Sequence, residues 1–168
     1  MILSIDGKTP RIASSACISQ FAFIAGDVEI GENCSVWPGA VIRADVGPIR
    51  IGTNTHVEDN CVVHGGPMDI GNNVIIGHCA SVHARSIGNN VMIGMNSTIL
   101  HKAEIGDYCL IGAMTLVIAG MKISGKCLAV GVPAKIKEIS ERSAHWVDRT
   151  GEEGVYSKLA REYMKQGF

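Results

Sequence analysis

An aliphatic residue recurs every six positions along most of the chain, and this period limits the possible folds more than any other sequence feature. The recurring residues are Ile12, Ile18, Ile24, Ile30, Val36, Ile42, Ile51, Val57, Val63, Ile70, Ile76, Val82, Ile87, Ile93, Ile99, Ile105, Ile111, Val117 and Ile123. A period of six fits neither an amphipathic helix, which requires about 3.6, nor an alternating strand, which requires about 2. It fits a short strand followed by a turn, repeated many times.

A small residue stands four places after most of these aliphatic residues, so the two positions are an even number of residues apart. The small residues are Ala16, Ala22, Val28, Cys34, Ala40, Thr55, Cys61, Val74, Ala80, Val91, Ser97, Ala103, Cys109, Thr115 and Cys127. Because side chains alternate between the two sides of a strand, residues an even number of places apart lie on the same side, and both point inward. Asparagines, which tolerate the positive φ of a tight turn, follow three places after the large residue at Asn33, Asn54, Asn73 and Asn90. Three such strands close a triangle of about 18 residues, and stacked triangles form a parallel β-helix, an all-β solenoid.

Composition and charge exclude several classes of protein. A net charge of −1 over 168 residues argues against a nucleic-acid-binding protein, which would carry a basic excess. With 46% hydrophobic residues the chain is too apolar to be disordered. No apolar run approaches the roughly 20 residues that cross a bilayer, so no membrane contact is expected. The first residues show no basic stretch followed by an apolar one, so we expect no signal peptide and a cytoplasmic location.

The six cysteines do not suggest a disulfide framework. Cys34, Cys61, Cys109 and Cys127 occupy the small inward position, where cysteine acts as a small buried hydrophobe. No C-x-x-C motif occurs, and reduced thiols are expected in the cytosol. Cys79 lies between two histidines and is a candidate ligand, but we favour a turn residue.

The six-residue pattern stops after Pro133. Helix-like spacing follows from Ile136 to Val147 and from Val155 to Met164, and Thr150 with Glu153 matches a capping box. We therefore divide the chain into a β-helix domain, residues 1–134, and a C-terminal helical extension, residues 135–168. This extension is expected to pack along the solenoid and cover its end, because terminal repeats need capping.

Three of the six histidines can be placed relative to one another from the repeat. His64 and His83 occupy the same outward slot on successive coils, about 4.8 Å apart, and such a pair can converge on one zinc ion. His78 lies near another corner, up to about 16 Å from His83 if the strand is extended. It cannot easily join the pair within one chain, but it can from a neighbouring chain. The symmetry of a three-sided prism then suggests a homotrimer with three equivalent sites. The remaining histidines match no pattern and are predicted to be surface residues: His56, His101 and His145.

Several segments carry resemblances to two known families. The run from Ile70 to Gly77 resembles the hexapeptide-repeat family, which implies that the β-helix is left-handed. The segments 62–64 and 77–83, with 41–45 and 57–60 upstream, resemble the gamma-class carbonic anhydrases. In that family two histidines from one subunit and one from the next hold zinc in a homotrimer. The resemblance implies His64, His83 and His78 as the ligands, and it implies that Arg43 and Asp45 form an interface pair near the metal.

The resemblance also implies a chemistry. Three neutral imidazoles leave zinc an open fourth position, and zinc lowers the pKa of bound water to about 7, as established for a carbonic anhydrase. Zinc hydroxide would attack CO2 to give bicarbonate, with Glu58 or Asp59 orienting the hydroxide. A solvated turn is the alternative for these two residues, and an ordinary interface ion pair is the main expectation for Arg43 and Asp45. Iron or cobalt could replace zinc in such a site.

The sequence departs from the gamma-class pattern at two places. Glu58 stands where the family commonly has glutamine, which changes the charge beside the metal-bound water. The acidic proton-shuttle loop has no counterpart, because Val46 follows Asp45 directly and only five residues separate His64 from the next repeat. We therefore expect a lyase of the carbonic anhydrase type with weak activity.

Two other functions remain open. The stretch from Gly131 to Lys135 resembles the end of the helix in hexapeptide acyltransferases, which bind acyl-CoA between subunits. A non-catalytic metal-binding trimer, siderophore-binding or structural, is the third possibility. Binding of acetyl-CoA distinguishes the acyltransferase, and metal loading without CO2 hydration distinguishes the non-catalytic trimer.

Overall fold

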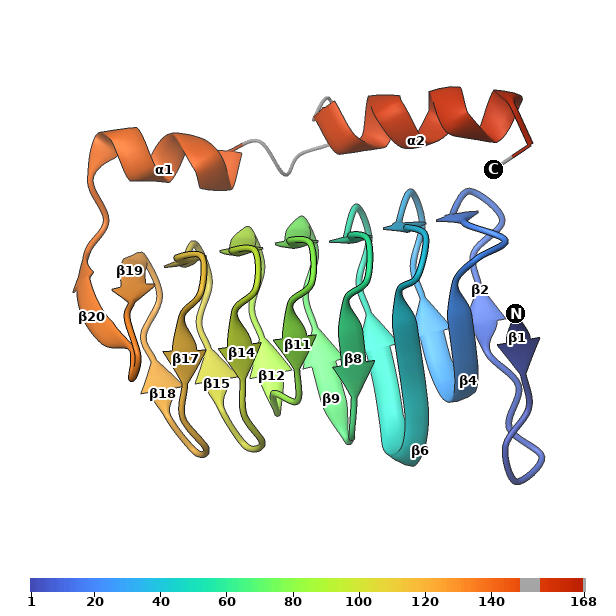
Figure 1. Cartoon of the computed structure of the whole chain (residues 1–168), viewed down its shortest axis with the longest axis horizontal. Helices are drawn as coiled ribbons and strands as arrows, with labels where there is room; N and C mark the ends of the chain where they lie inside the picture. Colours follow the sequence, from blue (N-terminus) through green and yellow to red (C-terminus); the bar gives the residue numbers. More distant parts are fainter. Residues whose placement is uncertain (149–154, 168) are drawn as a thin grey trace.

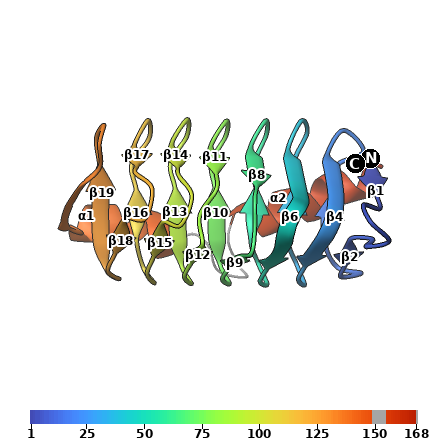
Figure 2. The same cartoon turned by 90° about the horizontal axis from the view of Figure 1, so that it is seen from below.

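The repeated units form the strands of a parallel β-helix in the computed structural model, which describes residues 1–148 and 155–167. The strands wind around three faces of a long prism (Figures 1 and 2). We define the histidine face by the first half of β6 (Val41–Ile51) together with β8 (Val62–His64), β11 (Ser81–Val82), β14 (Thr98–Ile99) and β17 (Leu116–Val117). The third face consists of the second half of β6 with β9 (Met68–Ile70), β12 (Ser86–Ile87), β15 (Glu104–Ile105) and β18 (Lys122–Ile123).

The helix face is the remaining side of the prism. It consists of β3 (Cys17–Ile18), β5 (Ser35–Val36), β7 (His56–Val57), β10 (Val74–Ile76), β13 (Val91–Ile93), β16 (Leu110–Ile111) and β19 (Cys127–Val130). At the N-terminal end, β1 (Ile2–Leu3), β2 (Arg11–Ile12) and β4 (Phe23–Ile30) extend the other two faces. Those two faces form one 12-stranded sheet, because β4 and β6 bend across the corner between them. The seven strands of the helix face form a separate sheet, which β20 (Lys135–Glu138) extends to eight strands.

The core confirms the six-residue prediction. Every predicted small position is buried, and so is every predicted large position from Ile24 onward; Ile12 and Ile18 are partly buried at the N-terminal end. Burial of each large aliphatic side chain stabilises the fold by about 1.5–3 kcal/mol. Since aromatic residues make up only 5% of the sequence, the interior is built mainly from stacked aliphatic side chains.

The predicted turn asparagines adopt the left-handed conformation. Asn33, Asn54, Asn73 and Asn90 have φ between 52° and 56°. Their side chains also connect successive coils, since the Asn54 amide donates to Asn73 at 3.3 Å and the Asn73 amide donates to Asn90 at 3.1 Å. The recurrence of asparagine therefore has two causes, which are backbone conformation and a side-chain ladder along one corner.

The cysteines lie where the repeat predicts. All six are free thiols; five are buried, and the exposed one, Cys79, is a turn residue with φ of 60°. Burial raises the pKa of Cys34 to about 11 and that of Cys61 to about 12. Such thiols remain protonated near neutral pH, which suits packing more than reactivity.

The chain after the last coil begins with a strand, so the helix predicted from Ile136 starts too early. β20 (Lys135–Glu138) pairs antiparallel with β19 and covers the edge of the helix face. α1 (Glu141–Asp148) follows, and the backbone N–H of Ser143 donates to the Ser140 hydroxyl at its start. The expected capping box at Thr150 and Glu153 lies outside the described residues.

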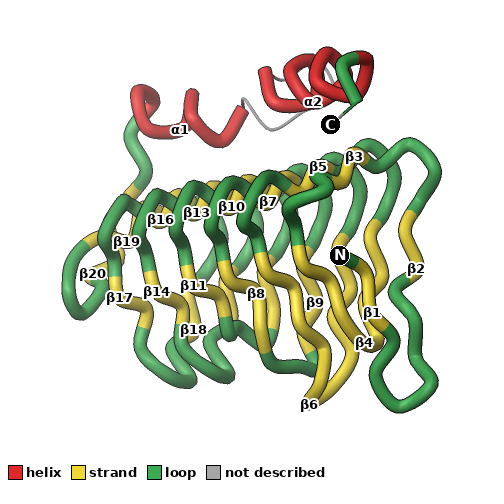
Figure 3. Tube along the Cα trace, turned by 45° about the vertical axis from the view of Figure 1, so that its right-hand side comes forward, coloured by secondary structure: helices red, strands yellow, loops and turns green. Residues whose placement is uncertain are grey.

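The second predicted helix is present as α2 (Val155–Lys165). Figure 3 shows α1 and α2 along the helix face of the prism, where α1 contacts β13 and β16 and α2 contacts β3 and β5. α2 buries Ala160 against Cys17 and Trp37, and the rings of Trp37 and Tyr163 meet edge to face at 5.4 Å. The helices therefore cover a side of the prism. Neither described helix is long and apolar enough to cross a membrane.

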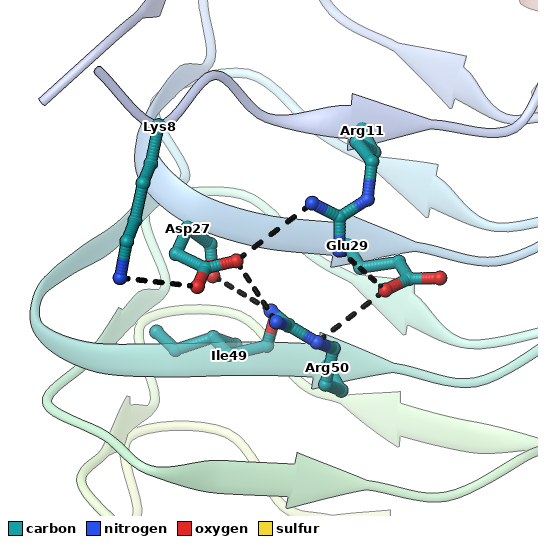
Figure 4. A network of polar contacts seen from close by, with 6 residues as sticks. All are labelled: Lys8, Arg11, Asp27, Glu29, Ile49 and Arg50. Atoms are coloured by element: carbon teal, nitrogen blue, oxygen red, sulfur yellow. Dashed lines mark hydrogen bonds and ion pairs between the residues drawn. The ribbon is translucent and has the colours of Figure 1, made fainter.

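A charged network braces the bend of β6 (Figure 4). Asp27 lies where the register of β4 against β6 shifts, between Gly26 and Val28. Arg50 of β6 contacts the Asp27 carboxylate at 2.9 Å and donates to its backbone carbonyl at 2.9 Å. Lys8 and Arg11 add further contacts to the same carboxylate, at 3.5 and 4.0 Å. The network thereby joins the corner of β4 to the second half of β6, on the third face.

Candidate metal centre

His64 and His83 form a stacked pair on the histidine face. His64 ends β8 and His83 follows β11, and the parallel register places the two residues side by side. The backbone N–H of His83 donates to the Ile99 carbonyl at 2.8 Å, which continues this register to the next coil. The ring centroids lie 5.0 Å apart with the ring planes at 79°. The predicted stacking is therefore present, while the role of both residues as ligands stays a prediction.

Arg43 and Asp45 surround His64. Arg43 is the register partner of His64, and its guanidinium Nε lies 3.1 Å from the Asp45 carboxylate. Nε2 of His64 lies 2.8 Å from Asp45 Oδ1 and 3.1 Å from the Arg43 guanidinium. Burial alone would raise the pKa of Asp45, but the hydrogen bond to His64 and the charge of Arg43 outweigh it and lower the pKa. The carboxylate is thus ionised and orients the imidazole of His64.

The electrostatics of His83 favour a neutral imidazole. Burial lowers the pKa of His83, and the neighbouring His64, His101 and Arg43 lower it further. A histidine must be neutral to bind a metal through its ring, so the lowered pKa of His83 suits a metal ligand.

His78 lies at another corner, between the helix and histidine faces, and two carboxylates hold it. Its Nε2 is 3.1 Å from Glu58 Oε2 and its Nδ1 is 3.0 Å from Asp59 Oδ2. The His78 backbone N–H also donates to Glu58 Oε2 at 3.1 Å. The Glu58 side chain is 2% exposed, so the solvated turn considered for this residue is wrong. Its second oxygen, Oε1, has no hydrogen-bond partner among the described residues.

The histidine pair and His78 open into different cavities. His64 and His83 line a cavity of about 590 Å³ on the histidine face. His78, Glu58 and Asp59 line another of about 360 Å³, which α2 closes with Tyr156, Leu159 and Tyr163. Within residues 1–148 and 155–167, no three histidine, cysteine or acidic side chains gather closely enough to hold a metal. The structure thus separates His78 from the pair within one chain, as the repeat predicts.

The other histidines fall into two groups. His101 and His145 are exposed, as predicted, although His101 also lines the cavity of the histidine pair. His56 is not a surface residue: it is 1% exposed under α2, where it stacks on Tyr156 and contacts the hydroxyls of Ser35 and Ser157. Its outward position in the repeat gave no signal of this burial, because the covering helix is distant in sequence.

Comparisons with known proteins agree with this architecture. The family model of the bacterial transferase hexapeptide (six repeats) matches residues 9–44 and 86–119. A carbonic anhydrase of Geobacillus kaustophilus is 40% identical over 99% of this chain and 89% of its own length. The carnitine operon protein CaiE of Escherichia coli is 31% identical over 85% of this chain and 75% of its own. The crystal structure of a hexapeptide transferase family protein from Anaplasma phagocytophilum superimposes with a TM-score of 0.91 at 35% identity, covering 96% of this chain and 97% of that one.

Proposed function

The chain belongs to the hexapeptide-repeat family, and from this premise we propose that it is a metal-dependent hydratase of the carbonic anhydrase type. The proposed site is shared between neighbouring chains of a homotrimer, and the substrate pair is CO2 and bicarbonate. One observation carries the proposal: a stacked pair of imidazoles, His64 and His83, lies on one face while a third histidine lies at a separate corner. The similarity to the Geobacillus carbonic anhydrase supports the choice of reaction.

The corner that carries His78 is suited to contact a second copy of the chain. Backbone hydrogen bonds stack its residues in a ladder, in which Asn96 donates to His78 and Met114 donates to Met95. Met95 and Met114, on the two coils that follow His78 in this ladder, are 47% and 71% exposed. On the histidine face Val62 is 37% exposed beside the imidazole pair. Burial of these apolar side chains between chains would favour association and bring a partner's corner to the pair.

The ligands proposed for the metal are His64 and His83 of one chain and His78 of its neighbour. Three neutral imidazoles suit zinc, and iron or cobalt are alternatives. A zinc ion bound by these residues would lower the pKa of a water molecule at the site. Both ring nitrogens of His78 are occupied by carboxylates within the chain, so one of these contacts must open when His78 binds a metal.

The remaining residues have positioning roles in this proposal. Asp45 Oδ1 accepts a hydrogen bond from His64 and fixes the ring, and Arg43 holds Asp45 in place. Buried Glu58 holds both the backbone and the ring of His78. Asp59 is 38% exposed, so its carboxylate is the group able to pass a proton to solvent. Partners of this kind typically contribute 10–100-fold to metal affinity or activity.

The experiment combines three measurements on one sample of purified protein. We expect a particle of about 53.4 kDa (3 × 17.8 kDa), about one metal ion per chain, and CO2 hydration that a chelator abolishes. His78→Ala should lose metal and assemble less well, whereas the exposed His145→Ala should match the wild type. A single-chain mass, or full metal content in His78→Ala, would refute the shared site. A metal-loaded trimer without hydration would favour the non-catalytic alternative.

An acyltransferase is the second candidate, favoured by the similarity to the Anaplasma hexapeptide transferase family protein. Acyl transfer would require acetyl-CoA to bind, so lack of binding at millimolar concentration would exclude it. A cytoplasmic location also forms part of our proposal, and the six free cysteines support it, because reduced thiols are typical of that compartment.

A further inference from the structure

The cavity over the histidine pair extends well beyond the two imidazoles. It has a volume of about 590 Å³, and its lining continues from His64 and His83 to Arg85, on the coil of His83, and to His101 and Lys102 on the next coil. Gly65 lines it as well, with φ of 120°, and a side chain there would meet only His83 Nδ1, at 4.0 Å, so its absence leaves the floor open. Small-molecule sites typically measure 300–1,000 Å³. Because the proposed neighbour's His78 would enter beside the histidine pair, the part of this space left for a ligand is the end that Arg85 and Lys102 line.

Two cationic side chains that line this cavity, Arg85 and Lys102, lack an acidic partner among the described residues. Within the described part of the chain, neither Arg85 nor Lys102 forms an ion pair, and both are exposed. The charged side chains around Asp27 behave differently, since Lys8 and Arg50 are both paired there. The single carboxylate that lines the cavity, Asp69, leaves an excess of positive charge.

The backbone holds the two cations on neighbouring coils at one corner. The Arg85 N–H donates to the Ala103 carbonyl at 2.8 Å, directly after Lys102 in the chain. Lys102 occupies a left-handed turn position, with φ of 61°. Arg85 provides a planar group able to bind two oxygens of one ligand at once, and Lys102 adds a second positive charge beside it.

We propose that Arg85 and Lys102 bind an oxyanion group, a carboxylate or a phosphate, of a small molecule that reaches into the cavity over His64 and His83. The inference deepens the proposed function, because it gives the site a substrate or effector larger than bicarbonate. His101 lines the same cavity and adds a polar contact. The cation pair selects for negative charge, and the open floor admits the remainder of the ligand.

The test uses full-length protein and two probes, inorganic phosphate and malonate, measured by titration calorimetry. Both the chelator-treated and the zinc-treated protein are titrated, so that binding to the cations is separated from binding to a metal. We expect saturable binding of at least one probe without metal, weakened at least tenfold in Arg85→Gln/Lys102→Gln, where the charge-assisted hydrogen bonds are lost. The matched control is Lys126→Gln, because Lys126 is also a turn lysine, with φ of 59°, and lies outside this cavity.

The outcomes separate this inference from the proposed function. Binding of phosphate alone or malonate alone supports the inference and identifies the oxyanion. Absence of saturable binding, or equal binding by the double variant, overturns it. Binding that requires zinc and persists in the double variant also overturns it, because the oxyanion then lies on the metal. If the wild-type protein bound phosphate or malonate but did not hydrate CO2, the proposed hydratase function would be refuted and the oxyanion site would stand.

Discussion

The buried His56 under α2 predicts a specific acid sensitivity of the fold. Burial lowers the pKa of His56 to about 4 from an ordinary value of 6.5. The neutral ring contacts the hydroxyl of Ser35 at 2.8 Å and that of Ser157 at 3.3 Å, and it stacks on Tyr156. Protonation in the folded state would place a charge between the β-helix and α2. We therefore expect acid to weaken the attachment of this helix to the β-helix.

The size and direction of the effect follow from proton linkage. In the unfolded chain His56 binds a proton near pH 6.5, and in the folded chain it binds one only near pH 4. The free energy of unfolding is therefore unaffected by this group above pH 6.5, and it falls as the pH drops from 6.5 to 4. A difference of about 2.5 pKa units corresponds to about 3 kcal/mol in total at 1.36 kcal/mol per unit. Between pH 7 and pH 5 the same values give a loss of about 2 kcal/mol.

The assay is urea unfolding at pH 7 and pH 5 and at fixed protein concentration, comparing wild type with His56→Gln. Glutamine cannot titrate, so the variant should be less stable at pH 7 but lose about 2 kcal/mol less than wild type on going to pH 5. The difference between the two proteins removes contributions from other groups, including His83. Equal losses of stability in both proteins would show that His56 is not a buried neutral group.

Three further perturbations test the packing and the site. Ile76→Ala should cost about 2–5 kcal/mol of unfolding free energy in urea, because the side chain is fully buried between coils and its removal leaves a cavity; a loss below about 1 kcal/mol would contradict the stacked core. Tyr163→Ala should lower the unfolding free energy by about 1 kcal/mol, since it removes the edge contact with Trp37. Limited proteolysis should then cleave α2 faster than in wild type, and unchanged cleavage would count against the packing of α2 on Trp37. Glu58→Ala should lower metal affinity about 10–100-fold, because it removes the acceptor that fixes the His78 backbone N–H. Glu58→Gln should retain more affinity, because its amide oxygen can still accept that hydrogen bond, and equal affinities in all three proteins would exclude this positioning role.

The β-helix can be predicted from the sequence, because side chains alternate along each short strand and the alternation repeats in every coil. Ile76 and Ala80 are buried as expected, since every coil supplies the same slots to its neighbours. The stacking of His64 and His83 is predictable for the same reason, because equal positions on successive coils must lie one rung apart.

The contacts made by the C-terminal segment depend on tertiary structure, which local spacing does not encode. The buried His56 owes its environment to Ser157, which is 101 residues away in sequence. The spacing around Ile136 suits a helix, but antiparallel pairing with β19 makes it a strand. Buried Glu58 contacts His78 from the next coil, and no sequence pattern marked that contact.

Mixing two inactive variants measures the shared site most directly. His78→Ala and His64→Ala chains, denatured and refolded together, should recover metal in mixed trimers, because one chain supplies the intact pair and its neighbour supplies His78. Random assembly should restore about one quarter of the wild-type metal content. Refolding each variant alone should restore none. If the mixture bound no more metal than the separate variants, the three histidines would not meet across a chain boundary.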